Sequence, residues 1–365
     1  MELVFDNIIF SLQRAGGISV YWYEILKRAL DDNDIFSTFI DQEGENIFRD
    51  QLPIKKDKIL DKFIYKFPNF VTRYLNITNL SGDGIFHSSY YRIANSDDFV
   101  NVTTVHDFTY EYFRTGIPKY VHSEQKRRAI LNSDHIICVS KNTKSDLLKF
   151  YPNINESNVQ VIYNGVNDCY QILSNSEGKR LSKLIPFKKG SYALYVGDRK
   201  SEYKNFTLTV KACIKSNTPL ALVGGGEVTN LEMDWLNRLG RNNYILLEGI
   251  SNKKLNLLYN YALCLIYPST YEGFGIPVIE AQKAGCPVVA SNKSAIGEVI
   301  GPVDTLGDDV TVGGISEMIE RYKTDIDYLN QQTRLGLENA KRFSWDKCYK
   351  ETKKVYKKLY YSHFQ

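Results

Sequence analysis

Short runs of β-branched and apolar residues alternate along the chain with longer stretches of helical periodicity. This alternation is typical of parallel sheets covered by helices on both faces, because a strand buried on both sides reads as a nearly continuous apolar run. In the first half the pattern predicts strands at Leu3–Ile9, Ile35–Ile40, Gly84–His87, Asn101–Val105, His135–Val139 and Val159–Ile162. It predicts helices at Gly17–Leu30, Asp57–Tyr74, Pro118–Asn132 and Lys141–Phe150.

The same alternation begins again in the second half of the chain. Here the strands are predicted at Tyr192–Val196, Leu220–Val223, Tyr244–Leu247, Leu263–Tyr267 and Pro287–Ala290, with helices that start near Lys204, Val228, Asn252 and Gly275. Between the halves, Asn167–Gly190 is rich in Asn, Ser, Gly and Lys and has little periodicity, which is typical of a linker.

These patterns predict an α/β protein with two doubly wound, Rossmann-like domains. We expect an N-terminal domain over residues 1–175, a C-terminal domain over 176–343, and a final helix within 344–365. Doubly wound sheets bind ligands at the carboxyl ends of their strands. Two such sheets facing each other are therefore expected to share a cleft that holds both substrates.

Composition and charge narrow the class of protein. The length of 365 residues suits two domains, and 46 basic against 42 acidic residues leave a net charge of +4, too small to indicate a nucleic-acid binder. The six cysteines form no Cys-x-x-Cys pair, which favours a reducing compartment. No basic, apolar leader begins the chain, and no run approaches the ~20 apolar residues of a membrane span. We expect a cytoplasmic protein.

The most informative segment is Tyr267–Ser291, which predicts a glycine-rich turn and a short helix between two apolar strands. Glu272 lies in the turn, where a glycine on either side of Phe274 lets a ligand approach the backbone. Glu280 lies in the helix that follows. The N–H groups at Gly275–Val278 have no partner within that helix, so they favour a phosphate, while the carboxylates favour hydroxyl groups. A nucleotide sugar carries both chemical groups.

Two cations follow the predicted strand Tyr192–Val196. Arg199 and Lys204 lie in the loop at its carboxyl end, where they are expected to neutralise a departing diphosphate. A paired-carboxylate glycoside hydrolase is the alternative for Glu272 and Glu280, but it leaves this cationic loop without a role.

Metal and dinucleotide sites have weaker support. Asp32-Asn33-Asp34 has the letters of an Asp-x-Asp metal site, but it lies between a helix and a strand, where these residues favour a turn. The histidines and cysteines form no zinc pattern, so no metal and no cofactor are expected. Gly224-Gly225-Gly226 ends a strand without the Gly-x-Gly-x-x-Gly spacing of a dinucleotide-binding oxidoreductase.

The first half offers two further candidates. Gly16 and Gly17 precede a predicted helix and leave free N–H donors near the start of the chain. His106 ends the strand Asn101–Val105 and is followed by Asp107, so its imidazole is placed to bind a sugar hydroxyl or to stabilise developing charge.

Several of these segments also match a known pattern. Glu-Gly-Phe-Gly-Ile-Pro at 272–277, with Glu280 and then Ala-Gly-Cys-Pro-Val-Val, resembles the Glu-x7-Glu signature of retaining glycosyltransferases of family 4. The resemblance extends from Gly16 to the C-terminal helix. It implies the GT-B fold, two Rossmann-like domains facing across a cleft, with the last helix crossing back to the first domain.

The resemblance also implies roles for individual residues. The catalytic set is His106, Glu272, Arg199 and Lys204. Donor binding is implied for Gly16, Gly17, Arg199, Lys204, Ile250, Glu272, Gly273, Phe274, Gly275, Ile276 and Glu280. Within this set, Glu280 binds the ribose, Glu272 binds the transferred sugar, and backbone groups at Ile250 contact the base.

Similarity to bacterial mannosyltransferases implies transfer of mannose from GDP-mannose to a glycan acceptor, with a lipid-linked acceptor in surface polysaccharide synthesis expected. A UDP-sugar or dTDP-sugar transferase, a nucleotide-sugar epimerase of the same fold, and an inactive assembly partner remain as alternatives. In Ile54–Tyr74 lysines are interleaved with aromatic residues, which favours either an anionic membrane surface or an ordinary surface helix. If the segment binds an anionic membrane surface, we expect the protein to be peripheral on the inner face of the cytoplasmic membrane.

Overall fold

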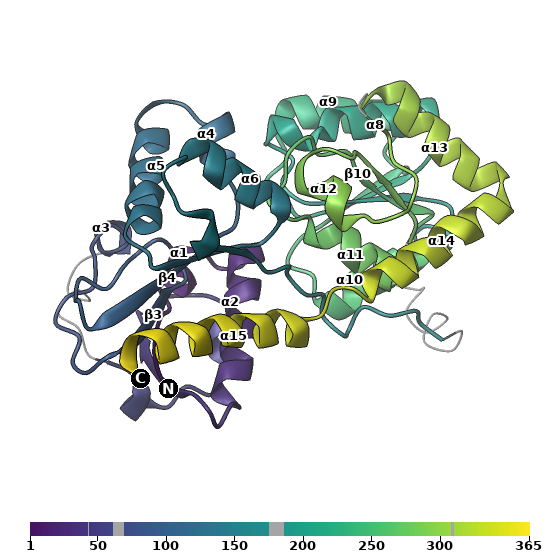
Figure 1. The fold of residues 1–365 in the computed structure, drawn as a ribbon. Coiled ribbons are helices and arrows are strands. Elements are labelled where there is room, and N and C mark those ends of the chain that lie inside the picture. Colours follow the sequence, from purple (N-terminus) through teal and green to yellow (C-terminus); the bar gives the residue numbers. More distant parts are fainter. Residues whose placement is uncertain (43, 61–68, 175–185, 308–309) are drawn as a thin grey trace. The chain divides into compact units, whose positions relative to one another are not determined.

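A computed structural model describes residues 1–42, 44–60, 69–174, 186–307 and 310–365 of the chain. It divides into two compact units (Figure 1). Unit 1 comprises Met1–Gly165 together with Trp345–Gln365, and unit 2 comprises Val166–Ser344. Each unit has its own parallel sheet and its own hydrophobic core.

Unit 1 is built on a parallel sheet of six strands in the order β2-β1-β3-β4-β5-β6. The strands are β1 Glu2–Asp6, β2 Phe36–Ile40, β3 Gly84–Ser88, β4 Phe99–Val105, β5 His135–Cys138 and β6 Val159–Val161. All residues of β3 and β4 are buried, as expected for central strands covered on both faces. The α-helices of this unit are α1 Ile9–Leu12, α2 Gly17–Leu30, α3 Asn69–Thr72, α4 Thr109–Phe113, α5 Gly116–Leu131, α6 Lys141–Phe150 and α15 Trp345–Phe364.

The C-terminal helix α15 packs against α2 and β3, although more than 250 residues separate it from them (Figure 1). Tyr356 is fully buried, and its hydroxyl lies 2.6 Å from Nδ1 of His87 on β3. Lys353 pairs with Asp32 and Asp34 at the end of α2. A buried aromatic face and a set of ion pairs therefore anchor this helix to unit 1.

Unit 2 is built on a parallel sheet of five strands in the order β11-β10-β7-β8-β9. The strands are β7 Ala193–Val196, β8 Leu220–Val223, β9 Tyr244–Leu247, β10 Cys264–Tyr267 and β11 Val288–Ala290. The α-helices are α8 Phe206–Lys215, α9 Asn230–Leu239, α10 Asn252–Tyr261, α11 Ile276–Lys283, α12 Ser294–Val299, α13 Val312–Thr324 and α14 Ile326–Ala340. Buried side chains on the central strands β7 and β10 contribute to its core, among them Ala193, Tyr195, Cys264 and Ile266.

The division between the units lies ten residues before the boundary expected at 175. Residues from Val166 onward pack on unit 2, because the backbone N–H groups of Gln171 and Leu173 donate to the side chains of Asn256 and Asn260 on α10. The composition of this segment is that of a linker, but its backbone is fixed by side-chain acceptors that no local periodicity reveals.

Two predicted elements need correction or fall outside the described chain. The strand expected at Leu3–Ile9 ends at Asp6, and α1 begins at Ile9. The helix expected at Asp57–Tyr74 and the basic aromatic segment Ile54–Tyr74 both include residues 61–68, which lie outside those described. The described parts hold a 3₁₀ turn at Lys56–Lys58 and the short helix α3.

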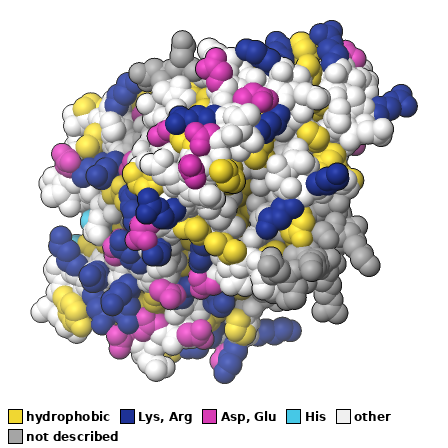
Figure 2. Space-filling model, turned by 90° about the vertical axis from the view of Figure 1, so that its right-hand side faces the viewer, with side chains coloured by type: hydrophobic (Ala, Val, Ile, Leu, Met, Phe, Trp, Pro, Cys, Tyr) yellow, Lys and Arg dark blue, Asp and Glu magenta, His cyan; other side chains and the backbone are white. Residues whose placement is uncertain are grey.

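The surface carries charges of both signs. On the face shown in Figure 2, basic and acidic side chains are interspersed and form no field of a single sign. Among the described helices, none is both long enough and apolar enough to cross a membrane.

Candidate active site

The glycine-rich turn after β10 leads directly into α11. Gly275, the residue before the helix, has φ +96°, a conformation that favours glycine, and Pro277 stands in the first turn, where its missing N–H costs no hydrogen bond. Among the described residues, no side chain caps this helix start. Its backbone N–H groups therefore keep the polarity that favours an anion.

Glu272 and Lys204 form the centre of this site. Lys204 Nζ lies 2.7 Å from Glu272 Oε1, and their side chains are only 15% and 14% exposed. Burial lowers the pKa of Lys204, but the charge of Glu272 acts together with Tyr203, Asp198 and the hydrogen bond to Glu272, so the pKa lies above the usual value for lysine. The backbone N–H of Glu272 donates to Ser294 Oγ at 2.8 Å. The structure thus places a charged ammonium and a carboxylate side by side, 68 residues apart in sequence.

Backbone contacts hold the two loops of this pair together. Asn205 adopts the left-handed conformation with φ +53°, and its side-chain amide donates to the carbonyl of Pro268. The N–H of Thr270 donates to the carbonyl of Tyr203 at 2.8 Å. Lys204 is therefore positioned by the residues on either side of it.

Arg199 has different partners from Lys204. Its guanidinium donates to the carbonyls of Gly224 and Gly226, and its Nε lies 3.2 Å from Glu232 Oε1. The Arg199 side chain is 2% exposed, and Glu232 also completes the capping box of α9 with Thr229. The structure pairs Lys204 with Glu272, whereas it aims Arg199 at the glycine turn after β8.

A glycine substitution tests this arrangement. A Cβ on Gly225 would lie 2.5 Å from Arg199 Nη1, at φ +95°, whereas a Cβ on Gly226, at φ +67°, would meet open space. We expect Gly225→Ala to lower the free energy of unfolding by about 2–4 kcal/mol and Gly226→Ala by only about 1 kcal/mol, because only the first adds a clash to the backbone strain. Urea unfolding measures both. Equal losses would show that Arg199 moves aside freely.

Glu280 lies between two tyrosines. Tyr259 donates to Glu280 Oε2 at 3.1 Å, and Tyr170 forms a second hydrogen bond with the same carboxyl group. Burial raises the pKa of Glu280 to about 7, and the two tyrosine hydrogen bonds oppose that rise. Tyr170 was not among the predicted site residues, because nothing in its sequence context distinguishes it from other linker residues.

The remaining donor-site candidates of unit 2 lie on the turn and at the end of β9. Phe274 is buried and packs edge-on against Phe343, with ring centroids 5.7 Å apart, so its side chain supports the turn. Gly273 is buried and Ile276 is half-buried beside it. Ile250 is half-buried just beyond β9 and follows Gly249, which has φ +59°.

The candidates of unit 1 lie at the ends of two of its elements. Gly16 precedes α2, and Gly17 begins it. No atom of the described residues beyond its immediate neighbours lies within 4 Å of the position that a Cβ on Gly17 would take. His106 follows β4 and contacts Tyr21 edge-on at 5.0 Å between ring centroids. Burial lowers the pKa of His106 to about 4, while Asp107 opposes and Lys126 assists this shift. The imidazole is therefore neutral at neutral pH.

The Asp-x-Asp letters at Asp32-Asn33-Asp34 belong to an ion-pair cluster. Asp32 pairs with Lys353, and Asp34 pairs with Lys353 and Lys357. Across the described parts of the chain, no three His, Cys, Asp or Glu side chains gather in a way that could hold a metal ion.

Two family models match the chain, one in each half. Residues 15–168 match the model "Glycosyltransferase Family 4", and residues 178–343 match "Glycosyl transferases group 1". The O-antigen chain mannosyltransferase B of Escherichia coli is 28% identical over 272 residues, which cover 71% of this chain and 70% of that protein.

Solved structures match over almost the whole chain. Sucrose-phosphate synthase from Thermosynechococcus elongatus has a TM-score of 0.73 at 16% identity, covering 99% of this chain and all of the other. Anabaena HepE in complex with UDP-glucose has a TM-score of 0.72 at 15% identity, covering 97% and 99%. The predicted fold class, with two parallel-sheet α/β domains of the GT-B type, is confirmed.

Proposed function

The chain belongs to the glycosyltransferases that join a Glycosyltransferase Family 4 domain to a Glycosyl transferases group 1 domain, and on this premise we propose that it is a retaining mannosyltransferase. The donor is GDP-mannose, and the acceptor is a glycan, lipid-linked, in the synthesis of a surface polysaccharide. Similarity to an O-antigen chain mannosyltransferase supports the choice of sugar. The observation that carries the proposal is the Lys204–Glu272 pair beside the uncapped start of α11.

The donor is bound by unit 2. Lys204 and the N–H groups at the start of α11 neutralise the diphosphate, Glu272 binds hydroxyls of the transferred sugar, and Glu280 binds the ribose. Arg199 fixes the turn Gly224–Gly226, and its remaining N–H groups donate hydrogen bonds to the phosphates. Backbone groups at Gly273–Ile276 and at Ile250 complete the contacts with phosphate and base.

Retention is proposed to follow from attack on the same face that the diphosphate leaves. The bond from the anomeric carbon to the phosphate oxygen breaks, the bond to the acceptor oxygen forms, and the departing phosphate oxygen takes the acceptor proton. The cation at Lys204 stabilises the charge that develops on the leaving group, so neither an enzyme nucleophile nor a metal ion is needed.

Unit 1 is proposed to hold the acceptor. Neutral His106 hydrogen-bonds a sugar hydroxyl, and the N–H groups at Gly16 and Gly17 bind phosphate or acceptor oxygens. The enzyme works in the cytoplasm, and a lipid-linked acceptor brings it to the inner face of the membrane. The basic aromatic segment Ile54–Tyr74 is the proposed contact with that surface.

A screen with nucleotide sugars tests the donor. Purified protein is incubated with GDP-mannose, UDP-glucose, UDP-N-acetylglucosamine and dTDP-glucose, and both thermal shift and release of the nucleoside diphosphate are measured. We expect GDP-mannose to give the largest stabilisation and the fastest release. Selective response to UDP-glucose would instead favour the UDP-sugar alternative, which the likeness to the UDP-glucose complex of HepE supports. Conversion of a UDP-sugar to its epimer without any acceptor would assign the protein to the epimerases.

A further inference from the structure

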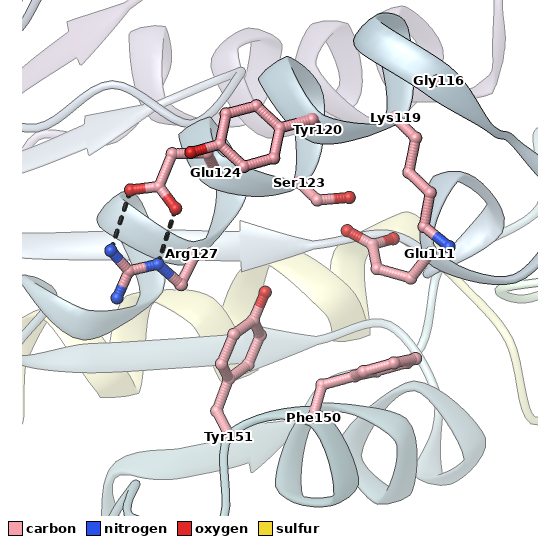
Figure 3. A pocket seen from close by; sticks show the side chains of 9 residues that line it. All are labelled: Glu111, Gly116, Lys119, Tyr120, Ser123, Glu124, Arg127, Phe150 and Tyr151. Atoms are coloured by element: carbon pink, nitrogen blue, oxygen red, sulfur yellow. Dashed lines mark hydrogen bonds and ion pairs between the residues drawn. The ribbon is translucent and has the colours of Figure 1, made fainter.

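A separate cavity lies in unit 1, bounded by α4, α5 and the end of α6. Its volume is about 370 Å³, within the usual range of small-molecule sites. Figure 3 shows side chains from α5 above the cavity and from the end of α6 below it. None of its lining residues belongs to the donor site.

Aromatic side chains form two sides of this cavity. Tyr120 on α5 is 73% exposed, and Phe150 and Tyr151 lie opposite at the end of α6 (Figure 3). A solvent-exposed aromatic ring beside a concave surface loses unfavourable hydration when a flat, partly apolar ligand covers it. The C–H faces of a pyranose ring have this character.

Within the described parts of the chain, two polar atoms at the same cavity have no hydrogen-bond partner. The side chain of Glu111 is 6% exposed, and its Oε1 is buried without a hydrogen bond. The hydroxyl oxygen of Ser123 is likewise buried and unpartnered. Leaving such atoms unsatisfied costs about 1–3 kcal/mol each, so a ligand that supplies hydroxyl groups is favoured here. A carboxylate oxygen accepts from a hydroxyl, and the serine both donates and accepts.

The cavity is linked to the strand end that carries His106. Lys126 has a fully buried side chain, and its Nζ lies 2.8 Å both from Glu111 Oε2 and from the backbone carbonyl of Asp107. Asp107 follows His106 directly, so a single buried lysine connects the acidic residue of the cavity to the proposed acceptor residue.

We propose that this cavity binds a sugar ring of the acceptor chain at a distance from the reacting end. The inference rests on the proposed function for the identity of the ligand as an acceptor glycan. The lining has no net positive charge to attract a phosphate, because Lys119 and Arg127 are balanced by Glu111 and Glu124. Glu124 and Arg127 also pair with each other at 2.7 Å. Such a subsite favours chains of several sugars over single sugars.

Direct binding tests the subsite. Isothermal titration of the full chain is carried out with linear tetrasaccharides of mannose, of glucose and of N-acetylglucosamine, and with the corresponding methyl monosaccharides. We expect at least one tetrasaccharide to bind tenfold or more tightly than its monosaccharide. Ser123→Leu, which fills the cavity from α5, and Tyr120→Ala, which removes the exposed ring, are each expected to weaken tetrasaccharide binding about tenfold, roughly 1.4 kcal/mol.

A matched control is Tyr361→Ala, because Tyr361 is also an exposed tyrosine, 56% accessible, but lies on α15 outside the cavity. It should leave binding unchanged, and thermal unfolding should show that all three variants are folded. The proposal is overturned if no tetrasaccharide binds the wild type, or if both cavity variants bind like Tyr361→Ala. Loss of binding to phosphatidylglycerol vesicles in both variants, without oligosaccharide binding by the wild type, would likewise overturn it and assign the surface to lipid.

The result of this binding test can be distinguished from the result of the donor screen. Cavity-dependent tetrasaccharide binding without mannose transfer would remove the proposed donor and keep the subsite. Mannose transfer with an unchanged preference for long acceptors in Ser123→Leu would keep the function and remove the subsite.

Discussion

Replacing Lys204 by alanine is expected to lower kcat/KM for sugar transfer by about 10²–10³-fold while the protein stays folded. Removing one preorganised group that stabilises developing charge has an effect of about this size. Here the loss is amplified because Glu272, only 14% exposed, loses its ion-pair partner and adds negative charge where the diphosphate departs. Initial rates with the donor found by the screen, together with circular dichroism and thermal unfolding, measure the two effects.

Lys200→Ala is the matched control for this substitution. Lys200 lies in the same loop, but it is exposed, and the ion-pair partner of Glu272 is Lys204. We expect its rate to remain within about threefold of wild type. If Lys204→Ala kept near wild-type turnover, the diphosphate would be neutralised elsewhere, and the unassigned donors of Arg199 would become the first candidates.

The contrast between Lys204 and Arg199 shows how far sequence reasoning reaches. Their position at the carboxyl end of a parallel strand follows from the apolar run before them, and the structure places both residues in the loop after β7. The direction in which each side chain points does not follow from that pattern. Arg199 turns to Gly224 and Gly226 because carbonyl groups that lie 25 and 27 residues away accept its donors.

The ionisation of Glu272 and Glu280 likewise could not be predicted from the sequence pattern. The spacing of Glu272 and Glu280 predicts that one lies in the turn and the other in the helix, and this is what the structure has. Their different surroundings come from distant residues: Lys204 neutralises the first, and Tyr259 with Tyr170 encloses the second. Local periodicity predicts which backbone element carries a side chain, whereas the ionisation of that side chain depends on the packing of other elements.

Strand positions could be predicted from the sequence pattern, whereas the packing of α15 could not. Strand positions were predicted to within a few residues, because the apolar runs are short and bounded by polar residues. The attachment of α15 to unit 1 depends on Tyr356 reaching His87 and on the lysines that pair with Asp32 and Asp34. Those contacts join segments more than 250 residues apart, so they cannot be predicted from a local sequence pattern.

Replacing Glu280 by glutamine is expected to weaken nucleotide binding by about 10–100-fold and, at pH 8, to stabilise the protein. A carboxylate accepts hydrogen bonds from two adjacent ribose hydroxyls, whereas an amide has only one acceptor oxygen, which accounts for about 1.4–2.8 kcal/mol of binding. The gain in stability has a separate cause: burial raises the pKa of Glu280 to about 7, so the ionised form is costly in the folded protein.

The sign of the pH dependence follows from proton counts. Between pH 4.5 and about 7 the folded protein holds the Glu280 proton more tightly than the unfolded chain does, so the free energy of unfolding falls as pH rises through this window. Above pH 7 the full cost applies, up to about 3 kcal/mol. Glu280→Gln should therefore show a higher Tm than wild type at pH 8 and a smaller difference at pH 5, while Glu317→Gln, an exposed glutamate on α13, should show neither change.

Nucleotide binding should have the opposite pH dependence to stability. We expect the ribose to bind only the ionised carboxylate of Glu280. As the pH drops below 7, the free site takes up a proton, so wild-type affinity for GDP should fall about tenfold per pH unit. Glu280→Gln should lose that dependence, since an amide does not titrate. Calorimetric titration with GDP at pH 6 and pH 8 distinguishes the two proteins. A wild-type affinity that is flat over this range would show that Glu280 does not bind the ribose, even if the variant were more stable.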